Sequence, residues 1–385
     1  MNTFEMDQTF VANTYGRFPI EIVKGKGSIV VDSDGKEYVD LATGIAVNAF
    51  GVCDEEWKNA VIAQLNAFSH TSNLYYSNPC AKLAKMLAEK TGLKKVFFSN
   101  SGAEANECAI KVARKYSEDK YGKNRYKIVT LINSFHGRTI TTLAATGQDV
   151  FHTSFTPLTQ GFEYATANDL DSVRRFVDKG DVAAVMLEVV QGEGGVMPLN
   201  KDFLEGVYKL CREKDVLLIC DEVQCGNGRC GKLYAYMNYD VRPDIVSTAK
   251  GLAGGLPLGA TMLGEKVENT LTPSTHGSTF GGNPVCSAGA VSILSRLTDE
   301  LMGEVRRKSE HIFKTLEGAK GVKSVSGLGL MIGIETEKEA SEVIRECIKN
   351  GVLVIKAKNK VRLLPALNID DALLDKALKV LINAL

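Results

Sequence analysis

The stretch that most constrains the fold is Val216–Asp221, VLLICD, a continuous apolar run that ends in an acid. A run of this length without polar alternation is typical of a parallel strand that is buried on both faces of a sheet. Such sheets occur in α/β folds, which bind ligands in the crevice at the carboxyl ends of their strands. Asp221 therefore marks both a central strand and the edge of the sheet where a site is expected.

Apolar segments of strand length alternate with helical patterns along the chain. Alternation of this kind predicts a mostly parallel sheet with helices on both faces. The helix that opens at Ser101 shows the clearest apolar stripe, Ala105, Cys108, Ala109, Val112, Ala113 and Tyr116. The expected strands are 95–98, 127–132, 182–188, 216–223 and 244–247. The expected helices are 78–92, one from Ser101, one from near Gly137, 201–214, 284–297, one ending near 320, 338–350 and one at the C-terminal end.

The same pass along the chain predicts its domain organisation. Residues 21–47 alternate apolar and polar positions with a turn at Asp34-Gly35, which indicates hairpin strands. We expect an N-terminal arm and hairpin over 1–50, which form part of a small domain, and a large domain over 51–290. A bridging helix over 291–320 then leads to a C-terminal small α/β domain over 321–385.

The composition of the chain argues against several kinds of binding partner. Lys plus Arg and Asp plus Glu both number 46, so nothing favours nucleic acid or an anionic membrane surface. No apolar stretch approaches the length of a membrane span, and MNTFEMDQTF lacks the layout of a signal peptide. Nine cysteines lie mostly in apolar runs and indicate a reduced, cytoplasmic protein. Cys220, Cys225 and Cys230 lack the close pairing of zinc sites, so no metal is expected.

A second informative stretch is VRPDIVSTAKGLAGGLPLGA, residues 241–260, which contains Lys250. The glycines and the proline after Lys250 disfavour a regular helix but suit a turn that lets a ligand lie close to the backbone. A lysine held there can lose its hydration, have its pKa lowered and become a nucleophile towards a carbonyl. The ordinary alternative for a single lysine is a solvated surface charge.

Asp221 and Lys250 together predict a particular cofactor, because they belong to neighbouring strand units. Pyridoxal phosphate needs a lysine that forms an imine with its aldehyde. It also needs an acid that keeps the pyridine nitrogen protonated, so that the ring can accept electrons. We therefore expect these two side chains to face one cavity, where they hold the two ends of this cofactor.

Six motifs carry a resemblance to a known family. They are SNSGAEANE (99–107), SFHGRT (134–139), EVVQGEGG (188–195), CDEVQCGNGRCG (220–231), TAKGLAGGLPLGA (248–260) and HGSTFGGNP (276–284). With these motifs the chain resembles the class III aminotransferases, which are fold type I pyridoxal-phosphate enzymes. The resemblance implies a large domain with a mostly parallel sheet of the seven-stranded type. It also implies a small α/β domain built from the N-terminal arm and the C-terminal segment.

The start of the helix at Ser101 allows two interpretations. Ser101 and Glu104 can form a capping box that satisfies the free amides of the first turn. The amides of Ser101-Gly102-Ala103 can instead bind a phosphate at the positive end of the helix dipole. The resemblance favours the phosphate. It also implies that Thr279 reaches the same phosphate from a neighbouring subunit, and hence a homodimer with shared active sites.

The resemblance also implies roles around the cofactor ring. Lys250 carries the cofactor and acts as general base and acid, and Asp221 pairs with the ring nitrogen. Phe135 stacks on one face of the ring, Val223 packs on the other and Gln224 lies near the ring hydroxyl. His136 is expected to flank the site with at most a hydrogen-bonding role.

Substrate recognition requires cations, since guanidinium binds carboxylates bidentately. By resemblance Arg362 binds the α-carboxylate of glutamate, and Arg138 binds the carboxylate of acetylornithine. Glu193 is expected to pair with Arg362 while the ω-amino substrate is bound, and Tyr15 and Ser278 to line the substrate end. A surface arginine is the alternative for both Arg138 and Arg362.

The opening NTYGRFP (13–19), FHGRT and the chain length make the acetylornithine aminotransferase subfamily the best match. The implied reaction moves the δ-amino group of N-acetylornithine to 2-oxoglutarate, giving N-acetylglutamate semialdehyde and glutamate, a step of arginine biosynthesis. Aminotransferases for ornithine, succinylornithine, succinyldiaminopimelate, 4-aminobutyrate or diaminopelargonate are the alternatives within the family.

Two further readings belong to other classes of protein. Residues 226–233 nearly match the P-loop of a nucleotide hydrolase, but Leu233 replaces the Ser or Thr that a magnesium ion requires. The run GLGLMIG at 327–333 has the wrong glycine spacing for a dinucleotide-binding fold. Both are disfavoured.

Overall fold

A seven-stranded sheet forms the centre of the structure, a computed structural model that describes residues 1–385. Its strand order is β4-β12-β11-β10-β7-β5-β6, and all neighbours pair in parallel except at β12, which is antiparallel to both of its partners. The strands are β4 (Lys95–Ser99), β5 (Lys127–Leu131), β6 (Phe162–Ala165), β7 (Val182–Leu187), β10 (Leu217–Asp221), β11 (Ile245–Thr248) and β12 (Gly259–Leu263). The expectation of a mostly parallel sheet is confirmed.

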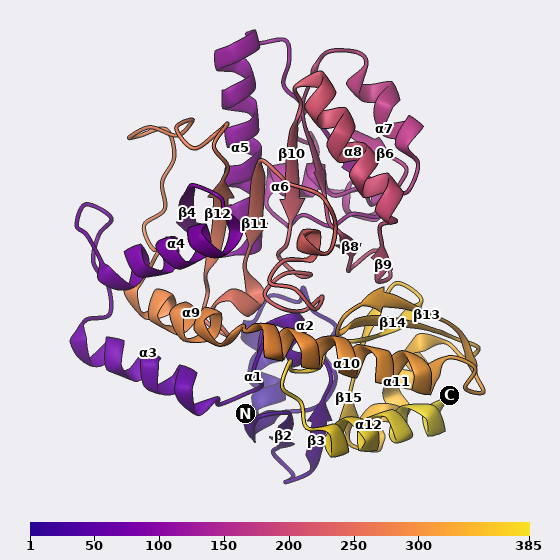
Figure 1. The fold of residues 1–385 in the computed structure, drawn as a ribbon. Coiled ribbons are helices and arrows are strands. Elements are labelled where there is room, and N and C mark those ends of the chain that lie inside the picture. Colours follow the sequence, from indigo (N-terminus) through magenta and orange to yellow (C-terminus); the bar gives the residue numbers. More distant parts are fainter.

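Helices cover both faces of this sheet (Figure 1). Helix α5 (Gly102–Tyr121) packs on one face, and α7 (Leu170–Val177) and α8 (Lys201–Lys214) lie on the other. Successive side chains of a strand point to opposite faces. Within β10, Leu217 and Ile219 belong to the core under α5, whereas Leu218 and Cys220 belong to the opposite core. The same alternation turns Asp221 towards α5.

Helix α5 begins where its sequence indicates. Ser101 is the N-cap residue, and its Oγ accepts a hydrogen bond from the backbone N–H of Glu104 at 3.2 Å. The stripe that includes Ala105, Cys108 and Val112 is fully buried against the sheet. This burial holds the N-terminus of α5 at the carboxyl edge of the sheet, beside the ends of β10 and β11.

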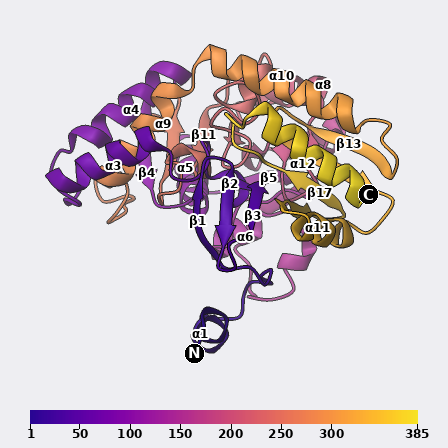
Figure 2. The same cartoon turned by 90° about the horizontal axis from the view of Figure 1, so that it is seen from below.

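The N-terminal hairpin is confirmed as β1 (Ile22–Lys26), β2 (Ile29–Asp32) and β3 (Glu37–Asp40), with a turn at Gly35. The arm before it contains a helix that the sequence pattern did not indicate, α1 (Thr3–Phe10). A capping box between Asn2 and Glu5 starts this helix, although none of its residues is buried. Figure 2 shows α1 standing away from the rest of the chain.

The C-terminal part contains a second sheet, β13-β14-β17-β16, with α10, α11 and α12 packed around it (Figure 1). Its strands are β13 (Val322–Leu328), β14 (Met331–Thr336), β16 (Ile355–Ala357) and β17 (Lys360–Leu363). The short strand β15 (Val352–Leu353) pairs in parallel with β3, so this part shares a sheet with the hairpin. We propose, on this pairing, that the hairpin and residues 321–385 form one small domain.

The remaining elements connect these parts. The helices are α2 (Thr43–Ala46), α3 (Glu55–Ala67), α4 (Asn78–Thr91), α6 (Ile140–Ala145), α9 (Pro284–Arg296), α10 (Asp299–Leu316), α11 (Ala340–Lys349) and α12 (Asp371–Ala384). Short 3-10 helices are η1 (Asp149–Phe151), η2 (Ala235–Asn238) and η3 (Lys250–Leu252), and β8 (Val190–Gln191) pairs with β9 (Met197–Pro198). None of the helices combines the length and the apolar character that crossing a membrane would require.

Two expected boundaries were wrong. The helix expected from near Gly137 begins at Ile140, because Thr139 and Thr142 form a capping box after the left-handed Gly137. The strand expected over 216–223 ends at Asp221, where the chain turns away from the sheet to build the wall of a cavity.

Candidate active site

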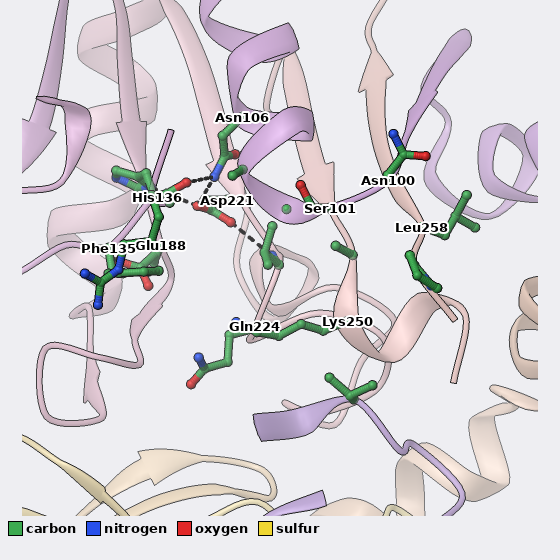
Figure 3. Close-up of a pocket in the computed structure, with 18 of the residues that line it drawn as sticks. Asn100, Ser101, Asn106, Phe135, His136, Glu188, Asp221, Gln224, Lys250 and Leu258 are labelled. Atoms are coloured by element: carbon green, nitrogen blue, oxygen red, sulfur yellow. Dashed lines mark hydrogen bonds and ion pairs between the residues drawn. The ribbon is translucent and has the colours of Figure 1, made fainter. Parts of the chain in front are cut away.

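A cavity of about 430 Å³ lies at the carboxyl edge of the large sheet. Asp221 ends β10 and Lys250 follows β11, the parallel strand next to it, and both side chains line this cavity. Figure 3 shows them on neighbouring parts of its wall. The predicted site residues that line it with them are Ser101, Gly102, Ala103, Phe135, Arg138, Val223 and Gln224.

Asp221 is buried and surrounded by hydrogen-bond donors. Its Oδ2 accepts from Asn106 Nδ2 at 2.7 Å and lies 2.8 Å from His136 Nδ1, and its Oδ1 accepts from the backbone N–H of Val223 at 3.0 Å. Two of these contacts come from N–H donors, and the ring nitrogen of His136 donates or accepts according to its tautomer. Asn106 comes from α5, on the face to which the alternation along β10 turns Asp221. The site thus contains a buried carboxyl group whose position is fixed by three contacts.

Lys250 occupies an unusual backbone position. It opens η3 with a φ of 46°, in the left-handed region that non-glycine residues rarely adopt. Such strain recurs at functional sites, where the surrounding structure imposes it. Part of the side chain is open to the cavity, but protein atoms surround the amine, and this burial lowers the pKa of Lys250. A lowered pKa leaves more of the amine uncharged and nucleophilic.

The N-terminus of α5 forms another wall of the cavity. The amides of Gly102 and Ala103 precede the first intrahelical hydrogen bonds, and Ser101 Oγ occupies only the amide of Glu104. A side chain at Gly102 would place its Cβ only 2.5 Å from Val223 Cγ1. Glycine therefore lets the helix start approach Val223 closely, and this leaves free N–H groups beside the cavity.

Arg362 and Glu193 form an ion pair next to the cavity. Arg362, on β17, is 2 % exposed, and its Nη1 donates to Glu193 Oε1 at 2.7 Å and to Gln224 Oε1 at 2.9 Å. Burial by itself would raise the pKa of Glu193, but the charge and hydrogen bond of Arg362 outweigh burial and lower it. Gln224 lines the cavity and therefore connects the ion pair to it.

The other predicted substrate residues lie further out. Arg138 is exposed at the cavity wall, with its guanidinium 4.2 Å from the ring centre of Phe151. Thr279 is exposed and does not line the cavity of its own chain, and Tyr15 is 69 % exposed on the N-terminal arm. Ser278 Oγ accepts from Asn100 Nδ2 at 3.1 Å, which ties it to a residue of the cavity wall.

From the sequence, Asn106 and Glu188 have no assigned role, and His136 has at most a hydrogen-bonding role. Asn106 and His136 both bind Asp221, and Asn106 Nδ2 also donates to the carbonyl of His136 at 2.7 Å. Glu188 follows β7 and is buried in the cavity wall. Asn106 lies next to the apolar stripe of α5 and is buried, and the sequence pattern gave no sign that its side chain faces Asp221.

Comparison with known proteins identifies the family of this chain. The family model for the class III aminotransferases matches residues 10–385. The chain belongs to the class III aminotransferases. An acetylornithine aminotransferase from Haemophilus ducreyi is 51% identical over 99% of this chain and 98% of its own.

Two solved structures extend the similarity to the fold. The N-acetylornithine aminotransferase from Stenotrophomonas maltophilia K279a has a TM-score of 0.86 and 35% identity, covering 99% of this chain and 98% of its own. An ornithine aminotransferase from Toxoplasma gondii has a TM-score of 0.94 and 32% identity, covering 99% and 93%. Its active site contains pyridoxal phosphate at partial occupancy.

Class III aminotransferases use pyridoxal phosphate, and the cavity fits this group. It offers a desolvated amine, a buried carboxylate and free helical amides, which match the aldehyde, the ring nitrogen and the phosphate. Buried polar atoms without a partner, Asn106 Oδ1 and His136 Nε2, lie next to Asp221. By contrast, no α-helix follows the glycine-rich run at 226–233, as a P-loop would require.

Proposed function

We propose that this protein moves the δ-amino group of N-acetylornithine to 2-oxoglutarate. The observation that carries the proposal is the shared cavity of Lys250 and Asp221 at the ends of two adjacent strands. Relatives named for acetylornithine in both comparisons support the choice of substrate. The products are N-acetylglutamate semialdehyde and glutamate, as in arginine biosynthesis.

We assign the cofactor to the inner part of the cavity. Lys250 would hold it covalently, Asp221 would face its ring nitrogen, and Ser101, Gly102 and Ala103 would bind its phosphate. Phe135 and Val223 would pack against its aromatic ring, and Gln224 would contact its hydroxyl group. Pyridoxal phosphate supplies a reactive aldehyde and an aromatic ring that withdraws electrons from the substrate.

The chain itself supplies the proton transfers. When it is not bonded to the cofactor, the Lys250 amine would act as a general base. It takes the proton from the substrate carbon that carries the amino group, and it returns a proton in the reverse direction. The lowered pKa of Lys250 suits this exchange, because an uncharged amine can accept a proton. Contacts with Asn106, His136 and the backbone N–H of Val223 hold the carboxyl group of Asp221 in place.

Arg362 and Glu193 provide a way to accept two different substrates. While Glu193 pairs with Arg362, the guanidinium is neutralised, so the cavity does not require an α-carboxylate near the reacting amine. When glutamate binds, its α-carboxylate displaces Glu193 and takes the bidentate position on Arg362. Arg362 Nε has no partner, so the guanidinium retains a free donor.

Arg138 is assigned to the distal carboxylates. It is exposed at the cavity wall and has no carboxylate partner within its own chain, so it can bind the carboxylate of acetylornithine or the distal carboxylate of glutamate. Tyr15 and Ser278 are assigned to the substrate end of the site.

We propose further that the protein is a homodimer. Leu74, Tyr75 and Tyr76 are strongly exposed, which is typical of a surface that another protein covers. Asn73 donates to the carbonyls of Ser278 and Gly281, so this apolar segment adjoins the loop of Thr279. Thr279 would then reach the phosphate in the partner's cavity. Nine free cysteines, seven of them buried, support the cytoplasm as its compartment.

Ornithine is the second candidate substrate, because the similarity to an ornithine aminotransferase spans the whole fold. Comparing kcat/KM for N-acetylornithine and for ornithine, each with 2-oxoglutarate, separates the two. We expect a clear preference for the acetylated substrate, because relatives at 51% and 35% identity are named for acetylornithine. A preference for free ornithine would overturn the assignment.

A further inference from the structure

Only two carboxyl groups line the cavity, and Glu188 is the one without a role in the proposed reaction. It follows β7 directly and is 5 % exposed. The neighbouring strands are β10, which ends in Asp221, and β5, which leads to Phe135. Glu188 therefore lies between Asp221 and Phe135 in the wall of the cavity (Figure 3).

The carboxyl group of Glu188 joins two loops that are distant in sequence. Its Oε2 accepts from the backbone N–H of Phe135 at 2.9 Å, and its Oε1 accepts from the backbone N–H of Gly192 at 3.4 Å. The first loop continues to Arg138, and the second continues to Glu193. One side chain thus connects both segments that carry the proposed substrate-binding groups.

Glu188 lies close enough to Asp221 for the charge of one carboxyl group to affect the other, and Glu188 is the one that retains a proton. Burial raises the pKa of Glu188 well above its usual value, and the negative charge of Asp221 raises it further. The amine of Lys250 opposes this rise, as do the two backbone amides. Two close carboxylates cannot both ionise cheaply. Glu188 is the group whose pKa is raised, and only two backbone amides contact its carboxyl group.

The other charged groups around Glu188 leave this balance intact. Glu193 lies on the same loop as Gly192, but Arg362 neutralises it. His136 faces Asp221, to which its Nδ1 is hydrogen-bonded. Arg138 follows in the same loop with its guanidinium over the rings of Phe135 and Phe151.

No cation forms an ion pair with Glu188 inside the cavity wall. Its hydrogen-bond partners are two neutral backbone amides, those of Phe135 at 2.9 Å and Gly192 at 3.4 Å. A buried carboxyl group without a cationic partner is expected to remain neutral, because burial disfavours its charged form.

We propose that Glu188 is a positioning residue: a neutral carboxylic acid that ties the loop of Phe135 to the loop of Gly192 and adds no second negative charge beside Asp221. It keeps the aromatic wall, Arg138 and Glu193 in a common arrangement. The inference depends on the proposed function only for its activity readout.

Two substitutions separate charge from hydrogen bonding. Glu188→Gln is neutral and retains a carbonyl acceptor for the Phe135 amide, so both half-reactions should stay within about threefold of the unmodified enzyme. Glu188→Leu has a similar size but no acceptor, so it leaves buried amides unpaired. It should lower kcat/KM by about 10- to 100-fold in both half-reactions.

A second readout needs neither cofactor nor substrate. The infrared difference spectrum between the apo forms of the unmodified protein and Glu188→Gln should contain the carbonyl band of a protonated carboxyl group at neutral pH. This band should disappear in alkaline solution. A role in packing alone would produce no such titration.

The outcomes decide the inference in either direction. If Glu188→Gln is as impaired as Glu188→Leu, or if the infrared band is missing at neutral pH, a charged carboxylate is required and the inference is wrong. Full activity of Glu188→Leu would also overturn it. Should Glu188→Leu not fold, the band and the Glu188→Gln rates decide. An unmodified enzyme that is inactive on N-acetylornithine would contradict the proposed function and leave the infrared result valid.

Discussion

Asp221 and Thr279 differ in their surroundings: residues of the same chain enclose Asp221, whereas Thr279 is exposed. Asp221, Asn106 and His136 are at most 3 % exposed and hydrogen-bond to one another within the chain. Thr279 and Tyr15 are exposed and lie outside the cavity wall. A single chain therefore completes the inner end of the site and leaves the outer end open, which is the arrangement expected where a second copy contributes.

The positions of these residues in the fold explain the difference. The inner residues lie on or next to strand ends and on α5, whose burial against the sheet leaves them little freedom. The outer residues lie on the N-terminal arm and on the loop before α9. Loops and arms gain order from contacts, and here those contacts are proposed to come from a partner subunit.

The largest effect is expected for Lys250→Ala, which removes the amine at the inner end of the site. Turnover should fall by at least about 1000-fold, because the general base is lost together with the covalent link to the cofactor. The fold should persist, since the substitution removes a buried amine whose pKa is already lowered by desolvation. Steady-state rates and thermal unfolding measure the two effects, and the exposed Lys94→Ala is the control. Rates near those of the unmodified enzyme would refute the role of Lys250.

A second, smaller effect is expected for Asp221→Asn, which retains the size of the side chain and removes its charge. A charge-assisted hydrogen bond contributes about 1.5–3 kcal/mol, so rates should fall by up to about 100-fold. Single-turnover rates of each half-reaction, followed by cofactor absorbance, measure the loss. Asp202→Asn on the exposed start of α8 should have no effect. Equal rates in the two variants would contradict the pairing of Asp221 with the ring nitrogen.

Arg362→Ala tests the boundary between the inner and outer ends. It should slow the glutamate half-reaction by about 10-fold more than the acetylornithine half-reaction, because only glutamate needs the guanidinium for its α-carboxylate. Arg362→Lys retains the charge without the bidentate geometry and should lie between the two. An equal loss in both half-reactions would rule out the assigned division between Arg362 and Arg138.

The outer end is tested by Thr279→Ala, for which a several-fold loss of cofactor affinity is expected from one lost hydrogen bond. Mixing this variant with Lys250→Ala sharpens the test. If Thr279 acts in the partner's site, a mixed dimer contains one site with both native residues, and activity at low cofactor concentration recovers. No recovery in a proven mixed dimer would place Thr279 in its own chain's site or outside any site.

The smallest effect is on stability alone and concerns Glu222, the neighbour of Asp221. Its carboxyl group accepts from the backbone amides of Ala235 and Tyr236, and burial raises the pKa of Glu222 to about 7. The folded state therefore retains a proton that the unfolded state loses above its ordinary pKa. Between about pH 4.5 and 7 the free energy of unfolding therefore falls as pH rises, by up to about 3 kcal/mol.

Glu222→Gln removes this titration, so its stability relative to the unmodified protein should rise across that pH range and then stay constant. Denaturant unfolding of the apo forms at several pH values measures the change, with Glu118→Gln on the exposed face of α5 as the control. A difference that does not vary with pH would contradict the raised pKa of Glu222.

Local patterns were sufficient to predict most of the sheet and its helices. The continuous apolar run that ends at Asp221 indicated β10, because that strand is buried on both faces. The periodic stripe after Ser101 indicated α5, because that helix is buried on one face. Helix α1 left no such signal, since it buries no residue and begins at a capping box. The antiparallel β12 was hidden in the glycine-rich run after Lys250, where propensity argues against regular structure.

The sequence by itself determined which groups are available for chemistry: an acid after a buried strand, a lysine in a glycine-rich turn, and arginines and a glutamate in recognisable motifs. Only the tertiary structure decided which groups share the electrostatics of the site. Asn106 and His136 contact Asp221, and Glu188 joins the loops of Phe135 and Gly192, because β5, β7 and β10 end, and α5 begins, at one edge of the sheet. Sequence spacing does not show which side chains meet at that edge, since contacts between neighbouring strands join residues that are far apart in the chain.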